Sequence, residues 1–359
     1  MVQIKAFLKY LFVYSLLAVI IATLFILFQS SDLMVKVLKF FVFPGILFII
    51  LGALFIDWFD RKLFARMQNR IGPRFLQPVY DMLKLLAKED ITPDGVDKFE
   101  FNIIPAVQVF LSIMVAFTVP IYIAEGLISF DGDLIFVLFL LALIGGSIFL
   151  LGWATNNPYA LIGGSRAATS EMAFEIPLAL SLIGPGLMTG SLRISTISVN
   201  LLDVISKNLL LAFPLVLCFI LSIISATAVL EKVPFDPAHA EVEIIGGWSI
   251  ELTGKKLFFT RLANLILEFG IAGLIAAIFL GGFGGFSLNL LTIGTWEVSS
   301  YLIAVILFVI KTCFVIFLIT LMRTLHSRIR IDQLVRYFWR YYLPMGFIAI
   351  LATILLVVN

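Results

Sequence analysis

Nine long runs of apolar residues constrain the possible fold of this chain more than any other feature of its sequence. Each run is close to the roughly 20 residues that an α-helix needs to cross the hydrocarbon core of a bilayer. We therefore predict an all-α fold, a polytopic membrane helical bundle with about nine transmembrane helices and one amphipathic interfacial helix. The predicted spans are 8–28, 37–59, 104–124, 134–153, 171–189, 209–230, 262–284, 300–322 and 342–358.

The composition excludes a soluble domain and several classes of site. Hydrophobic residues make up 61% of the chain and charged residues 13%, whereas a soluble domain has about 45–50% and about 25%. The net charge of +2 gives no reason to expect a nucleic-acid partner. Cys218 and Cys313 lie in apolar runs, and His239 and His326 stand far apart, so we expect no metal site and ordinary loop or helix-end roles for both histidines. The sequence contains no phosphate-binding, dinucleotide-binding or nucleophile-elbow motif.

Lysines and arginines are distributed unevenly over the predicted connections. If the N-terminus is cytoplasmic, only four fall on the outer side: Lys36, Lys39, Arg193 and Lys207. Because positive residues are enriched in cytoplasmic loops, we predict a multi-pass protein of the cell membrane with a cytoplasmic N-terminus and an outer C-terminus. The first run follows Lys5 and Lys9, as in a signal peptide, but it is long and lacks a small-residue cleavage site. We therefore expect residues 1–36 to hold a retained, additional helix.

The predicted cytoplasmic connections are 60–103, 154–170, 231–261 and 323–341, and they hold most of the polar residues. This concentration on one face suggests that a partner docks there. Within the first connection, QPVYDMLKLLAK at 77–88 places Val79, Met82, Leu83 and Leu86 on one face of a helix. We predict an amphipathic helix in the plane of the membrane interface, too short to span it.

The third connection contains a dense group of carboxylates between Lys232 and Gly254. The group consists of Asp236, Glu241, Glu243 and Glu251. Carboxylates that are desolvated or crowded at a low-dielectric boundary have raised pKa values and can exchange protons near neutral pH. The stretch is therefore either a proton relay or coupling switch, or an ordinary solvated loop.

Charged residues also lie inside or beside the predicted spans. Lys311 stands near the middle of 300–322, where a lysine costs about 2.5–3.5 kcal/mol on insertion scales. The others lie closer to span ends: Asp57, Asp60, Glu171, Glu175, Glu231 and Glu268. Each alone could be a snorkelling residue or half of a structural ion pair. Together they predict a polar axis from the cytoplasmic face toward the middle of the membrane.

Several motifs resemble those of one known family. In chain order they are RMQNRIGP at 66–73, LQPVYDMLK at 76–84, KEDITP at 88–93, GWATNNPYALIGGSR at 152–166, FEIP at 174–177, VPFDPAHAEVEIIGGWSIELTG at 233–254 and RTLHSRIRIDQLVR at 323–336. Their order and membrane placement resemble the H subunit of respiratory complex I, called subunit 1 in mitochondria, and its equivalent in membrane-bound hydrogenases. The resemblance covers 37–358; because family members usually have eight spans, 8–28 would be an addition.

The resemblance implies a non-catalytic junction subunit. Its cytoplasmic face would hold a large NiFe-like subunit and a small iron–sulfur subunit, its membrane flank would contact antiporter-like subunits, and all redox cofactors would lie in those partners. The charged positions of the family's motifs are matched by Asp60, Glu175, Glu241, Glu243, Glu251 and Lys311. The predicted coupling path consists of these residues together with four that the charge pattern singles out: Glu171, Glu231, Asp236 and Glu268. The implied redox-arm interface is Arg66, Arg70, Arg74, Asp81, Arg166, Trp248, Arg328, Arg330, Asp332 and Arg336.

The chain departs from the complex I pattern where that family forms its quinone chamber. His239 replaces a glutamate, Trp248 and Ser249 replace Tyr-His, and Asn264 replaces an acidic residue, with Glu268 one turn later. The resemblance therefore favours a ferredoxin-linked hydrogenase or sulfur-reducing complex over a quinone-reducing one. Whether protons or sodium ions are moved stays open. A third alternative is a stand-alone secondary transporter, against which the lack of an internal repeat argues.

Overall fold

The structure is a computed structural model that describes residues 32–122, 125–282 and 297–358. The chain forms two compact units, Met1–Phe48 and Ile49–Asn359. The described part of the first unit contains α2 (Asp32–Phe41) and the start of α3 (Ile46–Met67). The helices that follow in the second unit are α4 (Gln77–Ala87), α5 (Lys98–Phe117), α6 (Asp133–Ala154), α7 (Pro158–Thr189), α8 (Ile194–Lys207), α9 (Ala212–Val229), α10 (Glu241–Ile244), α11 (Gly254–Leu280), α12 (Glu297–Leu325), α13 (Ile331–Tyr337) and α14 (Leu343–Val358).

Eight helical segments in the described ranges are long and apolar enough to cross a membrane. They are Val37–Met67, Lys98–Phe117, Asp133–Ala154, Pro158–Thr189, Leu209–Val229, Gly254–Leu280, Ile303–Leu325 and Ile331–Val357. These correspond to the eight predicted spans from 37–59 onward, so the predicted helical membrane bundle is confirmed. The predicted span 8–28 lies outside the described residues.

The prediction that 154–170 is a connecting loop is wrong. Only a short turn separates α6 from α7, because Asn157 caps the new helix: its side-chain oxygen accepts a hydrogen bond from the Tyr159 amide at 2.9 Å. Pro158 follows in the first turn, where its missing N–H costs nothing. The helix then runs for 32 residues to Thr189. The glycines and polar residues of 163–170 therefore belong to a helix, and Arg166 lies on it.

Two further differences lie at the ends of predicted connections. Helix α3 continues to Met67 and α5 begins at Lys98, where Asp97 accepts a hydrogen bond from the Phe99 amide at 3.1 Å. The predicted outer connection between 190 and 208 contains α8, which buries Ile194, Ile197 and Leu201. Short amphipathic helices of this kind fall below the length that a hydrophobic-run criterion detects.

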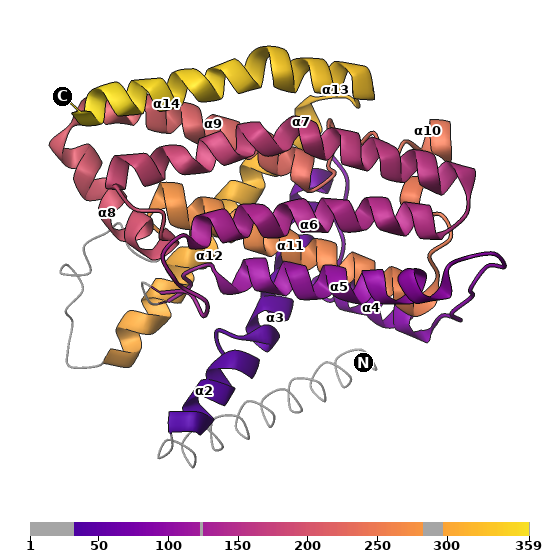
Figure 1. Ribbon diagram of the computed structural model, residues 1–359. Helices are drawn as coiled ribbons and strands as arrows, with labels where there is room; N and C mark the ends of the chain where they lie inside the picture. Colours follow the sequence, from indigo (N-terminus) through magenta and orange to yellow (C-terminus); the bar gives the residue numbers. More distant parts are fainter. Residues whose placement is uncertain (1–31, 123–124, 283–296, 359) are drawn as a thin grey trace. The chain divides into compact units, whose positions relative to one another are not determined.

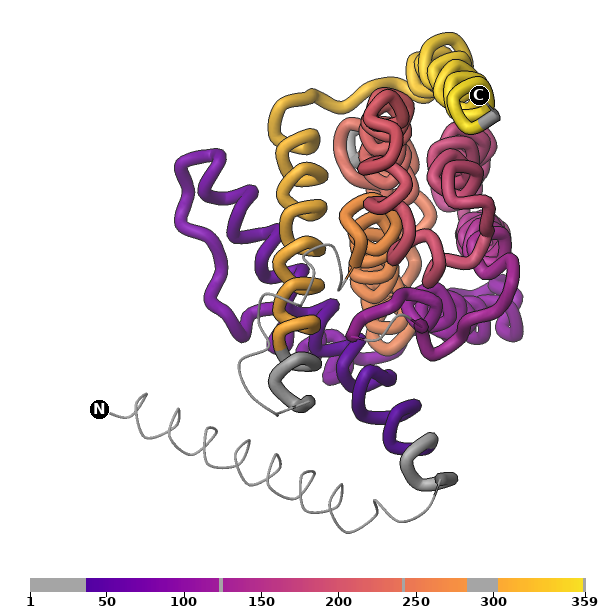
Figure 2. Tube along the Cα trace, turned by 90° about the vertical axis from the view of Figure 1, so that its left-hand side faces the viewer, coloured from indigo at the N-terminus to yellow at the C-terminus, as the bar shows by residue number. Residues whose placement is uncertain are grey.

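Helix α11 forms the centre of the second unit. Every residue from Leu265 to Phe279 is buried, whereas the other spans each leave part of their surface open. Helices α4, α5, α8, α9 and α12 pack against it. Figure 1 shows α14, α7, α6 and α5 side by side in that order, and Figure 2 shows the same helices nearly end-on. A charged residue on α11 therefore lies in the interior of the bundle.

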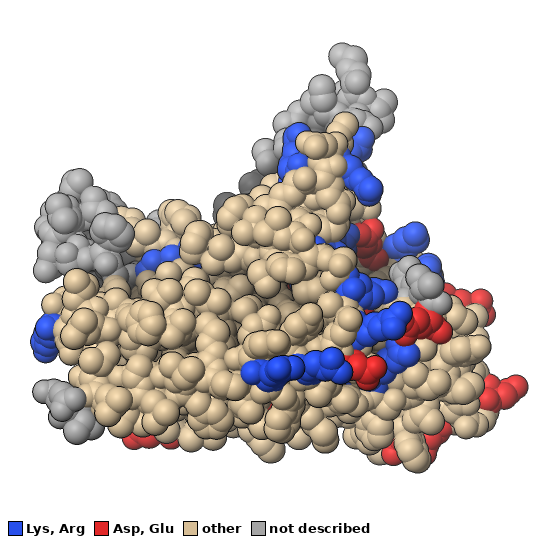
Figure 3. All heavy atoms as spheres, turned by 90° about the horizontal axis from the view of Figure 1, so that it is seen from above, with Lys and Arg blue, Asp and Glu red and all other residues tan. Residues whose placement is uncertain are grey.

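The predicted amphipathic helix is confirmed as α4, but its predicted apolar face is not buried as a whole. Pro78 and Met82 are buried on the side that packs against α11. Leu83 and Leu86, which the helical pattern places with Met82, are exposed. Most of the charged atoms in the face drawn in Figure 3 lie toward one end of that face, as the uneven charge of the connections predicts.

Candidate functional site

Two aspartates in the second half of α3 are buried. Asp57 is 4% exposed and Asp60 is 3% exposed, and their spacing of three residues places them on adjacent turns. Asp60 accepts hydrogen bonds from Lys232 at 3.0 Å, from Arg323 at 3.2 Å and from the Thr320 hydroxyl at 2.5 Å. Buried charges are stable only when they are paired in this way.

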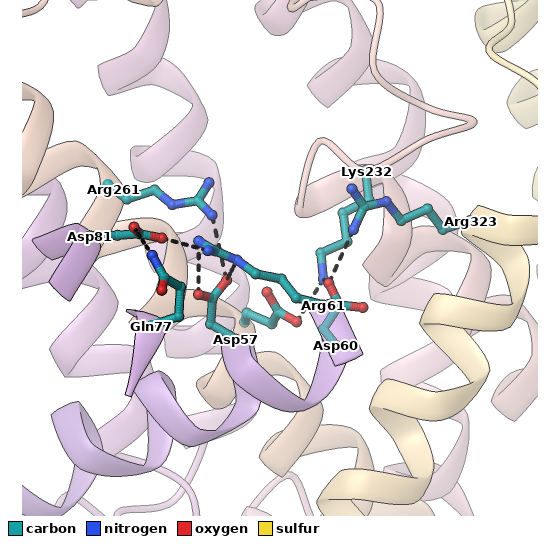
Figure 4. Close-up of polar contacts among 9 residues, drawn as sticks. Asp57, Asp60, Arg61, Gln77, Asp81, Lys232, Arg261 and Arg323 are labelled. Atoms are coloured by element: carbon teal, nitrogen blue, oxygen red, sulfur yellow. Dashed lines mark hydrogen bonds and ion pairs between the residues drawn. The ribbon is translucent and has the colours of Figure 1, made fainter. Parts of the chain in front are cut away.

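Lys232 joins Asp60 to a second buried carboxylate. Its ammonium group also donates to Glu268 on α11 at 2.6 Å, so one cation bridges two acids from different helices. Figure 4 shows Lys232 and Arg323 around Asp60. Burial acts to lower the pKa of Lys232, but the charges of Glu268 and Asp60 outweigh it and raise that pKa above its usual value. The two carboxylates therefore favour the charged form of Lys232.

A parallel set of contacts surrounds Asp57. Arg61, one turn along α3, donates to Asp57 at 3.1 Å and to Asp81 on α4 at 2.7 Å. Arg261 of α11 contacts the same oxygen atom of Asp57, Oδ1, at 3.5 Å. Burial acts to raise the pKa of Asp81, but hydrogen bonds from Arg61 and Gln77 outweigh it and hold that pKa below its usual value. The contacts tie the interfacial helix α4 to α3 and α11 (Figure 4).

The loop after α9 brings Glu231 into contact with two aromatic rings. Glu231 has a φ of +46°, an uncommon conformation for a non-glycine residue. Its carboxylate lies 3.0 Å from His239 Nε2 and accepts from the Trp248 indole at 3.3 Å. Burial acts to lower the pKa of His239, but the charge and hydrogen bond of Glu231 outweigh it and raise that pKa to about 9. His239 is therefore a charged partner of Glu231 at neutral pH.

Asp236 lies in the same loop and pairs with a residue far along the chain. Arg328 donates to Asp236 at 2.6 Å. Burial raises the pKa of Asp236 despite the opposing charges of His239 and Arg328. The pair connects the loop after α9 to the loop after α12.

These groups line two cavities that meet. We call the larger, of about 230 Å³, the charged cavity. Its charged lining residues are Asp57, Asp60, Arg61, Glu231, Lys232, Asp236, His239, Arg261, Glu268 and Arg323. We call the smaller, of about 50 Å³, the carboxylate cavity; its charged lining residues are Glu171, Glu175 and Glu231. Leu230, Glu231 and Asn264 line both cavities. Each cavity exceeds the roughly 10–15 Å³ that one water molecule needs.

The structure therefore brings six of the predicted coupling residues to two adjoining cavities: Asp60, Glu171, Glu175, Glu231, Asp236 and Glu268. Three others lie elsewhere. Glu243 pairs with Arg166 at 2.5 Å, and Glu251 accepts from Asn157 at 2.6 Å. Lys311 donates to the carbonyl oxygen of Leu280 at 2.7 Å, about 18 Å along α11 from Glu268 by the rise of a helix. The side chain of Glu241 lies outside the described part of the chain.

The predicted interface residues fall into three groups. Seven are exposed: Arg66, Arg70, Arg74, Arg328, Arg330, Asp332 and Arg336. Arg166 and Asp81 are half-buried and paired within this chain. Trp248 is 2% exposed and belongs to the same buried apolar cluster as Phe101, Leu151 and Leu252, so its ring forms part of the protein interior.

Several residues that build the charged cavity cannot be found from the sequence. The charge pattern places Lys232, Arg61, Arg261 and Arg323 among the loop or surface cations, and it predicts an ordinary loop role for His239. The local signal that bears on His239 is its position in place of a family glutamate.

In the described ranges, no group of three or more His, Cys, Asp or Glu residues could hold a metal ion.

Comparisons with known proteins match most of the chain. A family model described as NADH dehydrogenase matches residues 38–354. The H subunit of NADH-quinone oxidoreductase from Geobacillus kaustophilus is 33% identical over 306 residues, which cover 82% of this chain and 86% of the relative. The H subunit of the same enzyme from Bacillus cytotoxicus is 32% identical over 331 residues, 89% of this chain and 95% of the relative.

Proposed function

Because the chain belongs to the NADH dehydrogenase family, as a member of the group formed by the H subunits of complex I, we propose that it anchors a peripheral redox arm to the membrane and couples electron transfer there to ion translocation. The observation that carries this proposal is the pair of adjoining cavities. Paired charges from α3, α11 and α12 fill one, and carboxylates from α7 fill the other. Glu231 belongs to both, so a change of charge in one cavity acts directly on the other.

In the proposed mechanism, this chain relays a redox change in one partner to ion movement in another through its own side chains. A redox change in a partner docked beside the loop after α9 would alter the field at Glu231, His239 and Asp236. A proton or an ion-pair rearrangement would then pass through Glu231 to the carboxylates of α7. No electron passes through this chain, and the iron–sulfur and NiFe-type centres would belong to the peripheral partners. Antiporter-like membrane subunits would complete ion movement.

Within the family, we place this chain in the branch of ferredoxin-linked hydrogenases and sulfur-reducing complexes. Ligand pockets for apolar rings are lined mostly by hydrophobic side chains. The charged cavity has ten charged or titratable lining residues, with Leu230, Val233 and Leu265 among its few apolar ones. That lining suits ion pairs and water better than a quinone ring. The quinone-reducing function named for the relatives is the second candidate.

One experiment tests both the proposed coupling role and the proposed branch of the family. The complete complex is purified with wild-type chain, with Glu268→Gln and with the control Glu125→Gln, whose side chain is 62% exposed and pairs with Arg193. Electron transfer from reduced ferredoxin and the resulting ion gradient are measured in vesicles. We expect Glu268→Gln to reduce ions moved per electron by about tenfold, the effect of about 1.4 kcal/mol on a rate, and Glu125→Gln to leave it unchanged.

An unchanged ion-to-electron ratio in Glu268→Gln would contradict the proposed part of the charged cavity in coupling. The branch is tested on the same preparation with two acceptors. We expect proton or sulfur-compound reduction that quinone-site inhibitors do not affect. Quinone reduction that those inhibitors block, together with quinone in the purified complex, would support the second candidate instead.

A further inference from the structure

Two neighbouring glycines of α6 differ sharply in what surrounds them. A Cβ atom added to Gly145 would overlap Cδ and both carboxylate oxygens of Glu171. A Cβ added to Gly146 would meet nothing within 4 Å. The carboxylate of Glu171 therefore occupies the space that any side chain at position 145 would fill.

The space lies where α6 and α7 face each other, at the wall of the carboxylate cavity. Gly145, Glu171 and Glu175 all line that cavity, and the two glutamates are one helical turn apart on α7. Apolar residues such as Leu141 and Leu178 form much of the rest. No lysine, arginine or histidine is among the described residues that line it. A carboxylate in such surroundings keeps its charge only at a large cost.

We propose that Gly145 is a positioning residue that seats the carboxylate of Glu171 in α6, and that the seated Glu171 is the proton-accepting station of the carboxylate cavity. The inference rests on the proposed coupling function and deepens it. Glu231 would pass a proton to Glu175 or Glu171. The space left by the missing side chain of Gly145 fixes the position of the Glu171 carboxylate, where that path ends. If position 145 carried a side chain, the carboxylate of Glu171 would be turned away from its place against α6.

The contact at Gly145 differs from a glycine that only permits close packing. At Gly163, an added Cβ would meet the backbone of Gly247 and Trp248 at 2.5–2.7 Å, so a side chain there would push whole segments apart. At Gly145, the group in the way is the far end of a flexible side chain. Replacing Gly145 with alanine should therefore move the carboxylate of Glu171 by a side-chain rotation while the helices stay in place.

The test uses the complete complex in vesicles with four forms of this chain: Gly145→Ala, Glu171→Gln, the double variant of the two, and Gly146→Ala as the matched control. Electron transfer, ions moved per electron and the pH profile of ion movement are measured. We expect Gly145→Ala and Glu171→Gln each to lower the ratio several-fold and to shift its pH profile. We expect the double variant to be no worse than Glu171→Gln and Gly146→Ala to match wild type.

A wild-type ratio and pH profile in either Gly145→Ala or Glu171→Gln would overturn the inference, as would a double variant whose loss is the product of the single losses. These outcomes do not depend on Glu268→Gln. If Gly145→Ala and Glu171→Gln behave as expected while Glu268→Gln is normal, the seat is supported and the path through the charged cavity is wrong.

A further variant covers a failure of Gly145→Ala to assemble. Shortening Glu171 to aspartate withdraws the carboxylate by one methylene, so Gly145→Ala combined with Glu171→Asp should restore assembly and part of the ion movement. If this combination also failed to assemble, Gly145 would be needed for helix packing itself, and the inference would be overturned.

Discussion

The charged cavity and the carboxylate cavity adjoin each other but differ in whether their buried acids are paired with cations. In the first, each of three acids has a cation within hydrogen-bond distance: Lys232 and Arg323 for Asp60, Lys232 for Glu268, and Arg61 for Asp57. In the second, Glu171, Glu175 and Glu231 line the cavity together with many apolar residues, and the described lining residues include no lysine, arginine or histidine.

This difference predicts that the acids of the charged cavity keep a constant charge, whereas the acids of the carboxylate cavity change their protonation. A lysine or arginine within hydrogen-bond distance of an acid favours its charged form and opposes the effect of burial. Acids crowded together without a cation take up and release protons in coupled steps. We therefore expect the charged cavity to provide architecture and a constant field, and the carboxylate cavity to provide the group that changes protonation. Glu231, paired with His239, joins the two.

The largest expected effect breaks the charged cavity. Lys232→Met leaves Asp60 and Glu268 buried beside each other without their shared cation. Removing one partner of a buried pair costs about 3–5 kcal/mol, so we expect a marked loss of stability or of assembly. Thermal unfolding of the purified complex measures it. Lys255→Met, an exposed site on the first turn of α11, should change stability by less than about 0.5 kcal/mol.

That comparison is informative in both directions. A Lys232→Met complex as stable as wild type would mean that Asp60 and Glu268 tolerate protonation without their cation. The charged cavity would then share the property that we assign to the carboxylate cavity, and the contrast between them would disappear.

The next effect concerns the link between the cavities. The pKa of His239 is about 9, above its ordinary value of 6.5. A raised pKa in the folded state means that the Glu231–His239 pair contributes its full stability below pH 6.5. The contribution falls as pH rises from 6.5 to about 9 and is lost above that. The shift corresponds to at most about 3 kcal/mol.

Stability of the complex measured from pH 6 to pH 10 tests this link. Wild type should lose stability across that window, and His239→Gln should be less stable at pH 6 and flatter across it. His326→Gln, at an exposed histidine, should follow wild type. If His239→Gln showed the same pH dependence as wild type, the Glu231–His239 pair would not be the group that titrates, and the link between the two cavities would need another carrier.

The sequence predicts the spans and part of the path because both depend on local patterns. A run of about 20 apolar residues identifies a span by itself, and the spacing of Glu171 and Glu175 places them on one helical face. The pairing of Lys232 with Asp60 joins residues 172 positions apart, so no local pattern encodes it. Charge alone groups Lys311 with the path, whereas its ammonium group donates to the carbonyl at the end of α11.

The start of α7 shows a second limit of local patterns. Asn157 and Pro158 are an ordinary beginning for a helix. The segment that follows, however, contains glycines and polar residues, a composition that is also typical of a loop. Packing of that segment against α6 decides between the two, and such packing depends on residues outside the segment itself.

The smallest expected effect sharpens the contrast between buried and exposed pairs. Arg166 and Glu243 form an ion pair whose carboxylate side chain is 51% exposed, and exposed pairs contribute about 0–1 kcal/mol. Arg166→Gln should therefore leave the stability of this chain almost unchanged. If the exposed arginines nearby bind the peripheral arm, the same substitution should weaken retention of that arm at high salt, since solvent-exposed charge contacts are screened. Retention equal to wild type at every salt concentration would remove Arg166 from the predicted interface, whereas a loss of chain stability above about 2 kcal/mol would show that this pair belongs with the buried network.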